Sequence, residues 1–202
     1  MRVLAEKEAE ELLEKGGFNV VQRSFCFSRY GLRKSIKKIG FPFVLKAYGR
    51  NLFSKSKVEG VKSDVKTYTE ALLEFKNLKK IKGSRGVLVQ RKIKGKEFFV
   101  GLKRDSKSKF TVSFGFFVLN PKGEKEVVLR IFPAVKKKVK EIIKEANKHE
   151  KLSKKEKKSL EDFILEFFAF INKNKKISEI IADPLIVDGK NATVTGAKVV
   201  FG

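Results

Sequence analysis

The sequence has few of the residues from which compact metal and nucleophile sites are commonly built. Its 202 residues include one cysteine, Cys26, and one histidine, His149. A single cysteine excludes an internal disulfide, and the pair is too small a set for a Cys/His zinc site. A Ser/His or Cys/His catalytic pair would have to use His149. We therefore expect any chemistry of this chain to depend on carboxylates, lysines and backbone groups.

Long hydrophobic runs are also missing from the sequence. Residues 1–15 alternate charged side chains with leucine and alanine, which is unlike a signal peptide or a membrane anchor. Because 42% of the 202 residues are hydrophobic, the chain can still bury a substantial core. We expect a cytoplasmic protein that does not enter a membrane and that forms one globular unit with two subdomains.

Acidic residues are scarce: 23 Asp and Glu oppose 47 Lys and Arg, which gives a formal net charge of +24. This excess favours a polyanionic partner, because clustered cations displace counterions from a phosphate backbone. Compositional drift is an alternative, since 38 of the cations are lysines and the sequence is rich in residues with AT-rich codons. The low share of arginine speaks against bidentate phosphate or guanine recognition. Drift, a nucleic-acid or ribosomal partner and an acidic protein partner therefore all remain open.

Hydrophobic spacing in the first half of the chain predicts the order α-β-α-β-β-α. The predicted helices end at glycines or begin after polar residues, and the strands are short and rich in valine and phenylalanine. Helices are expected over 5–13, 32–39 and from 67 onward, with strands over 18–23, 43–47 and 61–65.

The second half begins with four apolar runs that predict an antiparallel sheet, at 86–93, 97–103, 110–119 and 127–132. Two helical stripes follow, over 135–146 and 160–171, and the charged run 148–158 between them is expected to be a solvated loop with adjoining helix ends. The aromatic stripe of the second helix is expected to be core. Strands over 180–187 and 192–201 are expected to form a hairpin through Asp188-Gly189.

Five segments of this chain occur in an order known from one family. They are Glu6–Leu13, Ile39–Lys46, Gly86–Gln90, Gly95–Asp105 and Ala182–Val187. Together they resemble the ATP-grasp β subunit of ADP-forming acetyl-CoA synthetases, which are relatives of succinyl-CoA synthetase, and the match covers nearly the whole chain. The resemblance implies an α+β ATP-grasp fold of two α/β subdomains with a nucleotide cleft between them. We place these approximately at 18–85 and 86–202, preceded by a helix over 1–17.

The resemblance also implies a nucleotide site for ATP or ADP. Lys46 matches the family lysine that holds ATP phosphate from the end of a strand. Val89 and Gln90 match the hinge whose backbone binds adenine, and Glu97 matches the acid that commonly meets the ribose. Arg130 matches an arginine near the phosphates.

Some of these positions have ordinary structural alternatives. Lys46 could be a simple strand-end lysine, and Arg130 could pair with Glu126 on an exposed edge strand. The family usually has an acid after the hinge glutamine, where this chain has Arg91.

Departures from the family concern phosphate transfer and metal binding. Ser54 stands at the position of the histidine that accepts phosphate, and a serine cannot replace an imidazole as a phosphoryl relay. The residues Gly115–Val118, which include Phe116 and Phe117, replace a glycine-rich turn that would cradle phosphate. For Mg²⁺, Asp183 replaces an asparagine and can still offer oxygen, whereas Gly196 replaces a second ligand, an aspartate.

Two functions from different classes follow. The first is an enzyme that interconverts acyl-CoA, ADP and phosphate with acid, CoA and ATP, and this needs Mg²⁺ and a CoA-binding α partner. The second is a non-catalytic pseudoenzyme that keeps the fold and acts as a basic binding or structural protein, docking on RNA, the ribosome or an acidic protein. Because the losses fall in separate functional elements, we expect reduced or lost catalysis.

Overall fold

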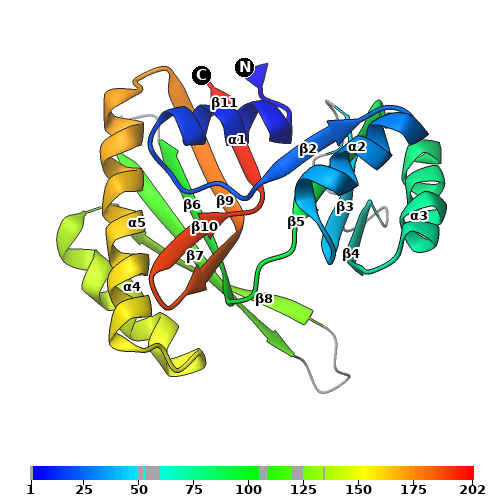
Figure 1. The fold of residues 1–202 in the computed structure, drawn as a ribbon. Helices are drawn as coiled ribbons and strands as arrows, with labels where there is room; N and C mark the ends of the chain where they lie inside the picture. Colours follow the sequence, from blue (N-terminus) through cyan, green and yellow to red (C-terminus); the bar gives the residue numbers. More distant parts are fainter. Residues whose placement is uncertain (1, 50–51, 53–59, 105–108, 120–124, 134) are drawn as a thin grey trace. The chain divides into compact units, whose positions relative to one another are not determined.

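The computed structural model describes residues 2–49, 52, 60–104, 109–119, 125–133 and 135–202. The chain divides into two units, each built on its own β-sheet (Figure 1). The small-sheet unit is Val21–Ile93, and the large-sheet unit combines Met1–Val20 with Lys94–Gly202. The chain therefore passes from one unit to the other twice.

The small-sheet unit is a four-stranded antiparallel sheet with two helices on one face. Its strands, in the order β2-β5-β3-β4, are β2 (Arg23–Cys26), β5 (Gly86–Arg91), β3 (Phe43–Tyr48) and β4 (Val61–Val65). The helices are α2 (Arg29–Ile39) and α3 (Tyr68–Lys80). Each begins at a residue whose hydroxyl accepts a backbone N–H: Ser28 from Gly31 and Thr67 from Glu70.

Apolar side chains of both helices pack on the same face of this sheet. Leu32 of α2 and Phe75 of α3 share one core cluster with Phe43, Leu45 and Val89. Since side chains alternate along a strand, the residues between these core positions lie on the opposite face. We call that opposite face the helix-free face of the small sheet.

The large-sheet unit contains a seven-stranded antiparallel sheet. The path β1-β11-β9-β6-β7-β8 runs through β1 (Arg2–Val3), β11 (Ala197–Phe201), β9 (Ile177–Asp188), β6 (Lys96–Arg104), β7 (Phe110–Leu119) and β8 (Lys125–Pro133), and β10 (Asn191–Val194) pairs with β9. Its helices are α1 (Glu6–Lys15), α4 (Lys136–His149) and α5 (Lys154–Lys173).

The core of the large-sheet unit lies between the sheet and these helices. Phe98 and Phe114 from the sheet share one cluster with Ile142 of α4, Phe167 of α5 and Leu13 of α1. Phe18, just after α1, packs edge-on against Phe163, Phe167 and Phe170, with ring centroids 5.4–5.5 Å apart. Strand residues that alternate with this core lie on the other face, the helix-free face of the large sheet. None of the helices in the described part is long and apolar enough to cross a lipid bilayer.

The structure differs from the sequence-based expectation at the boundary between the units. The expected boundary followed residue 85, and 86–93 was expected to pair with the next three strands. Instead, β5 pairs with β2 and β3, so the division falls after residue 93. The helix at the N-terminus belongs to the unit formed by the second half of the chain.

Two further element predictions need correction. The segment predicted as a strand over 18–23 contributes a single bridge, Val20 to Val194, and the strand itself begins at Arg23. The final run 192–201 is two strands, β10 and β11, because the chain leaves β9 and then pairs with it a second time. The charged segment 148–158 has the loop and the adjoining helix ends that were expected, since α4 ends at His149 and α5 begins at Lys154.

The early start of α5 depends on a capping box that the lysine run conceals. The Ser153 hydroxyl accepts the Glu156 N–H at 3.2 Å, and the Ser153 N–H donates to the Glu156 carboxylate at 2.6 Å. We expect Ser153→Ala to destabilise the protein by about 1 kcal/mol and to lower Tm by about 2–4 °C in a thermal melt. Ser159→Ala, inside the same helix, is the control and should not lower Tm, since alanine is the better helix former; equal losses in both variants would contradict the capping role.

Candidate functional site

Lys46 and Gln90 are the predicted site residues that the small sheet brings together. Lys46 lies opposite Leu88 in β5, and Gln90 lies opposite Val44 in β3, so the two are diagonal neighbours on adjacent strands. Both alternate with core residues and therefore lie on the helix-free face of the small sheet. Lys46 is only 7% exposed and Gln90 only 2%. Such burial is rare for lysine and usually accompanies a partner for the ammonium group.

The backbone at Val89 and Gln90 belongs to the centre of the small sheet. Val89 faces the core and is fully buried. Arg91, where the family usually has an acid, is exposed and donates its backbone N–H to the Gln22 carbonyl at 2.9 Å. An acid does lie beside the residue that follows Arg91: the Asp64 carboxylate contacts Lys92 at 2.6 Å and also Lys66 at 3.0 Å. Hydrogen bonds from these two lysines lower the pKa of Asp64.

Glu97 and Asp183 lie in the large-sheet unit. Glu97 precedes the buried Phe98 on β6 and is paired with Ile186 of β9, so its side chain is on the helix-free face of the large sheet. Asp183 follows the buried Ala182 at a point where the β6–β9 register shifts, and it is exposed. Both predicted acids thus belong to the face that α4 and α5 leave uncovered.

Position 196 has no room for a side chain. A Cβ atom built on Gly196 would collide with the backbone carbonyl oxygen of Asp183. The two residues are also joined by a hydrogen bond of 2.8 Å from the Asp183 N–H to the Gly196 carbonyl. Here the family aspartate is not merely missing, because the close approach of the two backbones requires glycine.

Glu179, on the same strand as Asp183, is already part of an ion pair. Glu179 of β9 accepts a hydrogen bond from the Lys198 ammonium of β11 at 3.1 Å. In the described part of the chain, no three or more His, Cys, Asp or Glu side chains are grouped so as to hold a metal ion. With position 196 closed to a carboxylate, the pair of oxygen ligands that the resemblance implies for Mg²⁺ does not fit this backbone.

Within the large-sheet unit, Arg130 and Glu97 lie on opposite faces of the sheet. Arg130 is paired with the buried Phe114, so it lies on the helix-covered face of the large sheet, opposite to Glu97 and Asp183. Its Nε lies 3.8 Å from Glu145 Oε1 on α4. Glu145 also contacts Lys148 at 3.0 Å, and the hydrogen bond from this lysine lowers the pKa of Glu145. Arg130 therefore joins a surface ion-pair cluster.

No glycine-rich turn is found at Gly115–Val118. This segment is part of β7: all four residues are paired with β8, and Gly115 and Phe116 are also paired with β6. The Phe116 ring is fully buried and stacks on His149, with ring centroids 3.9 Å apart. The only histidine of the chain is thus used in packing. Ser54, at the position of the family's phosphate-accepting histidine, lies outside the described residues.

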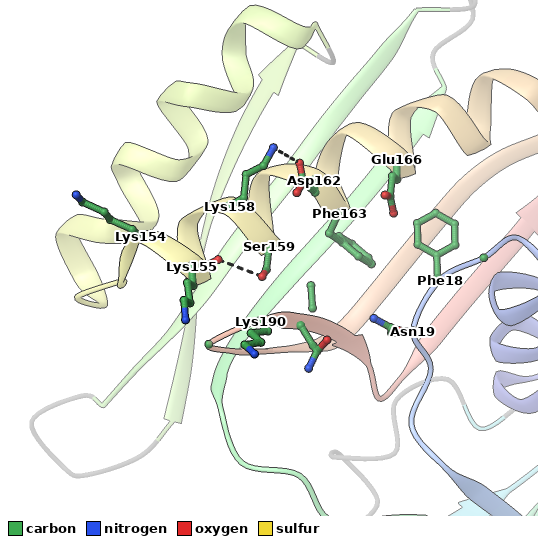
Figure 2. Close-up of a pocket in the computed structure, with 14 residues that line it drawn as sticks. Phe18, Asn19, Lys154, Lys155, Lys158, Ser159, Asp162, Phe163, Glu166 and Lys190 are labelled. Atoms are coloured by element: carbon green, nitrogen blue, oxygen red, sulfur yellow. Dashed lines mark hydrogen bonds and ion pairs between the residues drawn. The ribbon is translucent and has the colours of Figure 1, made fainter.

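A pocket of about 490 Å³ lies elsewhere in the large-sheet unit (Figure 2). Its walls are the turn after α1, the N-terminal half of α5 and the turn between β9 and β10. Phe18 and Phe163 supply apolar surface, while Lys158 is turned toward Asp162, 2.7 Å away. None of the predicted site residues lines this pocket. Sequence reasoning missed it because its walls come from segments far apart along the chain.

Comparison with known proteins defines the protein family to which this chain belongs. The family model for the ATP-grasp domain matches residues 1–201, and the chain therefore belongs to this family. The α+β fold assignment and the resemblance to the β subunit of ADP-forming acetyl-CoA synthetases are thereby confirmed.

Individual relatives make the resemblance more specific. An acetate–CoA ligase (ADP-forming) II of Archaeoglobus fulgidus is 29% identical over 206 residues, covering 99% of this chain and 30% of the relative. The acetate–CoA ligase (ADP-forming) I subunit beta of Pyrococcus furiosus is 27% identical, covering 99% and 92%. A solved structure of Ca. Korarchaeum cryptofilum acetyl-coenzyme A synthetase 1, in complex with coenzyme A and Ca-AMPCP, is 25% identical with a TM-score of 0.83, covering 100% and 94%. The chain thus spans less than a third of the Archaeoglobus ligase but nearly all of the Pyrococcus subunit.

Proposed function

We propose that this chain is a nucleotide-binding ATP-grasp subunit of the ADP-forming acyl-CoA synthetase type in which phosphoryl transfer is reduced or lost. The observation that carries the proposal is the 7% exposed Lys46 beside the buried Gln90 on one face of the small sheet. Strands on both sides of Lys46 fix its backbone, so a phosphate that contacts its ammonium meets a cation already in position. The family and its relatives support the nucleotide as ligand.

Each surviving residue has a distinct role in this proposal. Lys46 neutralises phosphate charge as a compact cation. The hinge at Val89 and Gln90 is assigned to adenine from the family resemblance, although its strand is paired with β2 on one side and with β3 on the other. Glu97 accepts hydrogen bonds from the ribose. We leave Arg130 out of this set, because its pairing places it on the helix-covered face.

Reduced catalysis follows from three positions that transfer would need. Gly196 cannot carry a carboxylate, which leaves Asp183 without its partner in holding Mg²⁺. The paired strand at Gly115–Val118 offers no loop of free amides to a phosphate. Ser54 cannot relay a phosphoryl group to ADP, since a serine phosphoester is too stable. We infer that the site holds a nucleotide better than it uses one.

The proposed partner is a CoA-binding α subunit. The Pyrococcus relative is a β subunit, and the Archaeoglobus ligase is several times longer than the segment that this chain matches. In the acyl-CoA synthetase reaction, acyl-CoA, ADP and phosphate are converted to acid, CoA and ATP. The CoA-binding step would belong to that partner, and the present chain would contribute nucleotide binding.

A calorimetric titration with ATP, in Mg²⁺ and in EDTA, tests this proposal. We expect binding in both buffers, with Kd changing by less than about threefold, because the site relies on Lys46 more than on a metal. Absence of binding at about 5 mM ATP would overturn the nucleotide role. Binding that requires Mg²⁺ would keep that role but overturn the weakened metal site. Formation of ATP from acetyl-CoA, ADP and phosphate with a CoA-binding partner would overturn the loss of transfer.

A further inference from the structure

The positive charge of this protein is concentrated in the small-sheet unit. Residues 21–93 contain 19 of the 47 Lys and Arg but only 4 of the 23 Asp and Glu. The large-sheet unit has 28 basic and 19 acidic residues, so its charges are much closer to balance. A codon bias would act on both units alike, so it does not explain why the small-sheet unit has so few acidic residues. The asymmetry favours a polyanion as partner of the small-sheet unit.

Two large aromatic side chains are exposed at one end of this unit. Phe27 is 59% exposed and Tyr30 is 68% exposed, on either side of Ser28, where α2 begins. Phe27 is braced by Phe25, whose ring meets it edge-on at a centroid distance of 4.2 Å, and Phe25 in turn packs against Tyr48 at 4.4 Å. The Phe27 ring is thus held in place by a neighbour, and more than half of the surface of both Phe27 and Tyr30 is exposed.

Four basic residues lie on or next to the segments that carry these two rings. The Lys34 ammonium lies 4.7 Å from the centre of the Tyr30 ring, one helical turn along α2. Lys79, from the end of α3, donates to the Phe27 carbonyl at 2.9 Å. The Arg85 backbone N–H donates to the Tyr48 carbonyl at 2.6 Å, which places Arg85 beside the ring cluster. Arg29 lies between Phe27 and Tyr30 in the sequence and is exposed.

We call the set Phe27, Arg29, Tyr30, Lys34, Lys79 and Arg85 the basic aromatic surface. Within the part of the chain that the structure describes, none of its four cations forms an ion pair with a carboxylate. Helix α2 itself contains no acidic residue. The charge of this surface is therefore available to a ligand.

We propose that the basic aromatic surface binds single-stranded nucleic acid. Lysine and arginine follow the phosphates, while exposed rings stack on bases that are not already stacked in a duplex. Every base has a flat π-face, so such contacts tolerate many sequences. This surface was missed from the sequence, which shows arginine and aromatic residues near each other but not that Phe27 and Tyr30 remain exposed. An acidic protein would match the charge but would not need unstacked bases.

Fluorescence anisotropy with a labelled 12-nucleotide oligouridylate and the full chain tests the proposal. We expect affinity to fall with salt, with a log–log slope of about −2 or steeper if three or more phosphates are bound. Phe27→Ala and Tyr30→Ala should each weaken binding about fivefold or more. Leu73→Ala is the matched control, because Leu73 is an exposed apolar residue of the same unit, 57% exposed on α3, and should leave affinity unchanged.

A charge variant provides a second, independent measurement. Arg29→Gln combined with Lys34→Gln removes two exposed cations and should make the salt slope shallower by about 0.7 for each phosphate that the variant no longer neutralises. Wild-type affinity for the oligouridylate in both ring variants would overturn the proposal. It would also be overturned if the ring variants lost as much affinity for a duplex of the same length as for the single strand. Ring-dependent binding of polyglutamate without ring-dependent binding of the oligouridylate would assign the surface to an acidic protein instead.

Discussion

Replacing Lys46 with methionine is expected to weaken ATP binding about 10- to 100-fold, because a hydrogen bond to a charged group contributes about 1.5–3 kcal/mol. Methionine keeps the length of the aliphatic stem and removes the ammonium. Lys46 is only 7% exposed and lies on a strand paired on both sides, so the substitution should preserve the sheet. The variant should therefore remain folded and melt cooperatively. Calorimetric titration and a thermal melt measure the two effects.

Lys62→Met supplies the matched control for Lys46. Lys62 lies on the adjacent strand β4, opposite Leu45, and therefore on the other face of the same sheet. The control changes the net charge by the same amount, so it tests whether ATP is held by a particular cation or by the general positive field. Equal losses of affinity in Lys46→Met and Lys62→Met would contradict the assignment of Lys46 as the phosphate-binding residue.

Local sequence patterns predicted most elements of this fold but not all of their pairings. Alternation and helical spacing located β3 and α3 closely, because each buries one face. The same patterns could not show that β5 pairs with β3, since its apolar run GVLVQ resembles those of the following strands. Strand pairing depends on the register between neighbouring strands and on which apolar side chains each unit buries in its own core. That information is not contained in one strand.

The candidate site shows the same contrast: motifs indicate which residues to consider, whereas strand pairing determines the face of the sheet on which they lie. Motif matching identified Lys46 and Gln90, and their register then places them on one face. Arg130 was assigned to phosphate from its motif, but its side is set by its pairing with Phe114 in the neighbouring strand. A shift of one residue would have reversed that side. Likewise, a sequence shows that Gly196 lacks a carboxylate but not that the Asp183 carbonyl occupies the space.

Restoring the family aspartate by Gly196→Asp is expected to destabilise the large-sheet unit rather than to rebuild a metal site. The new Cβ would collide with the Asp183 carbonyl, which is backbone and is fixed by its hydrogen-bonded neighbours in β9. Overpacking of this kind costs about 1–3 kcal/mol or more when side-chain rotation cannot relieve it. We expect Tm in a thermal melt to fall by about 2–12 °C, with no rise on addition of Mg²⁺.

Gly189→Asp separates this steric effect from the general cost of placing an aspartate in the region. Gly189 lies in the turn between β9 and β10, and a Cβ added there would meet nothing within 4 Å. The same substitution should therefore change Tm by no more than about 1–2 °C. If Gly196→Asp melted like the control and gained Tm with Mg²⁺, the backbone at Asp183 would be able to move, and the loss of metal binding would be reversible by one residue. If it melts early and ignores Mg²⁺, the close approach of the backbones at 183 and 196 prevents the substitution from supplying a metal ligand.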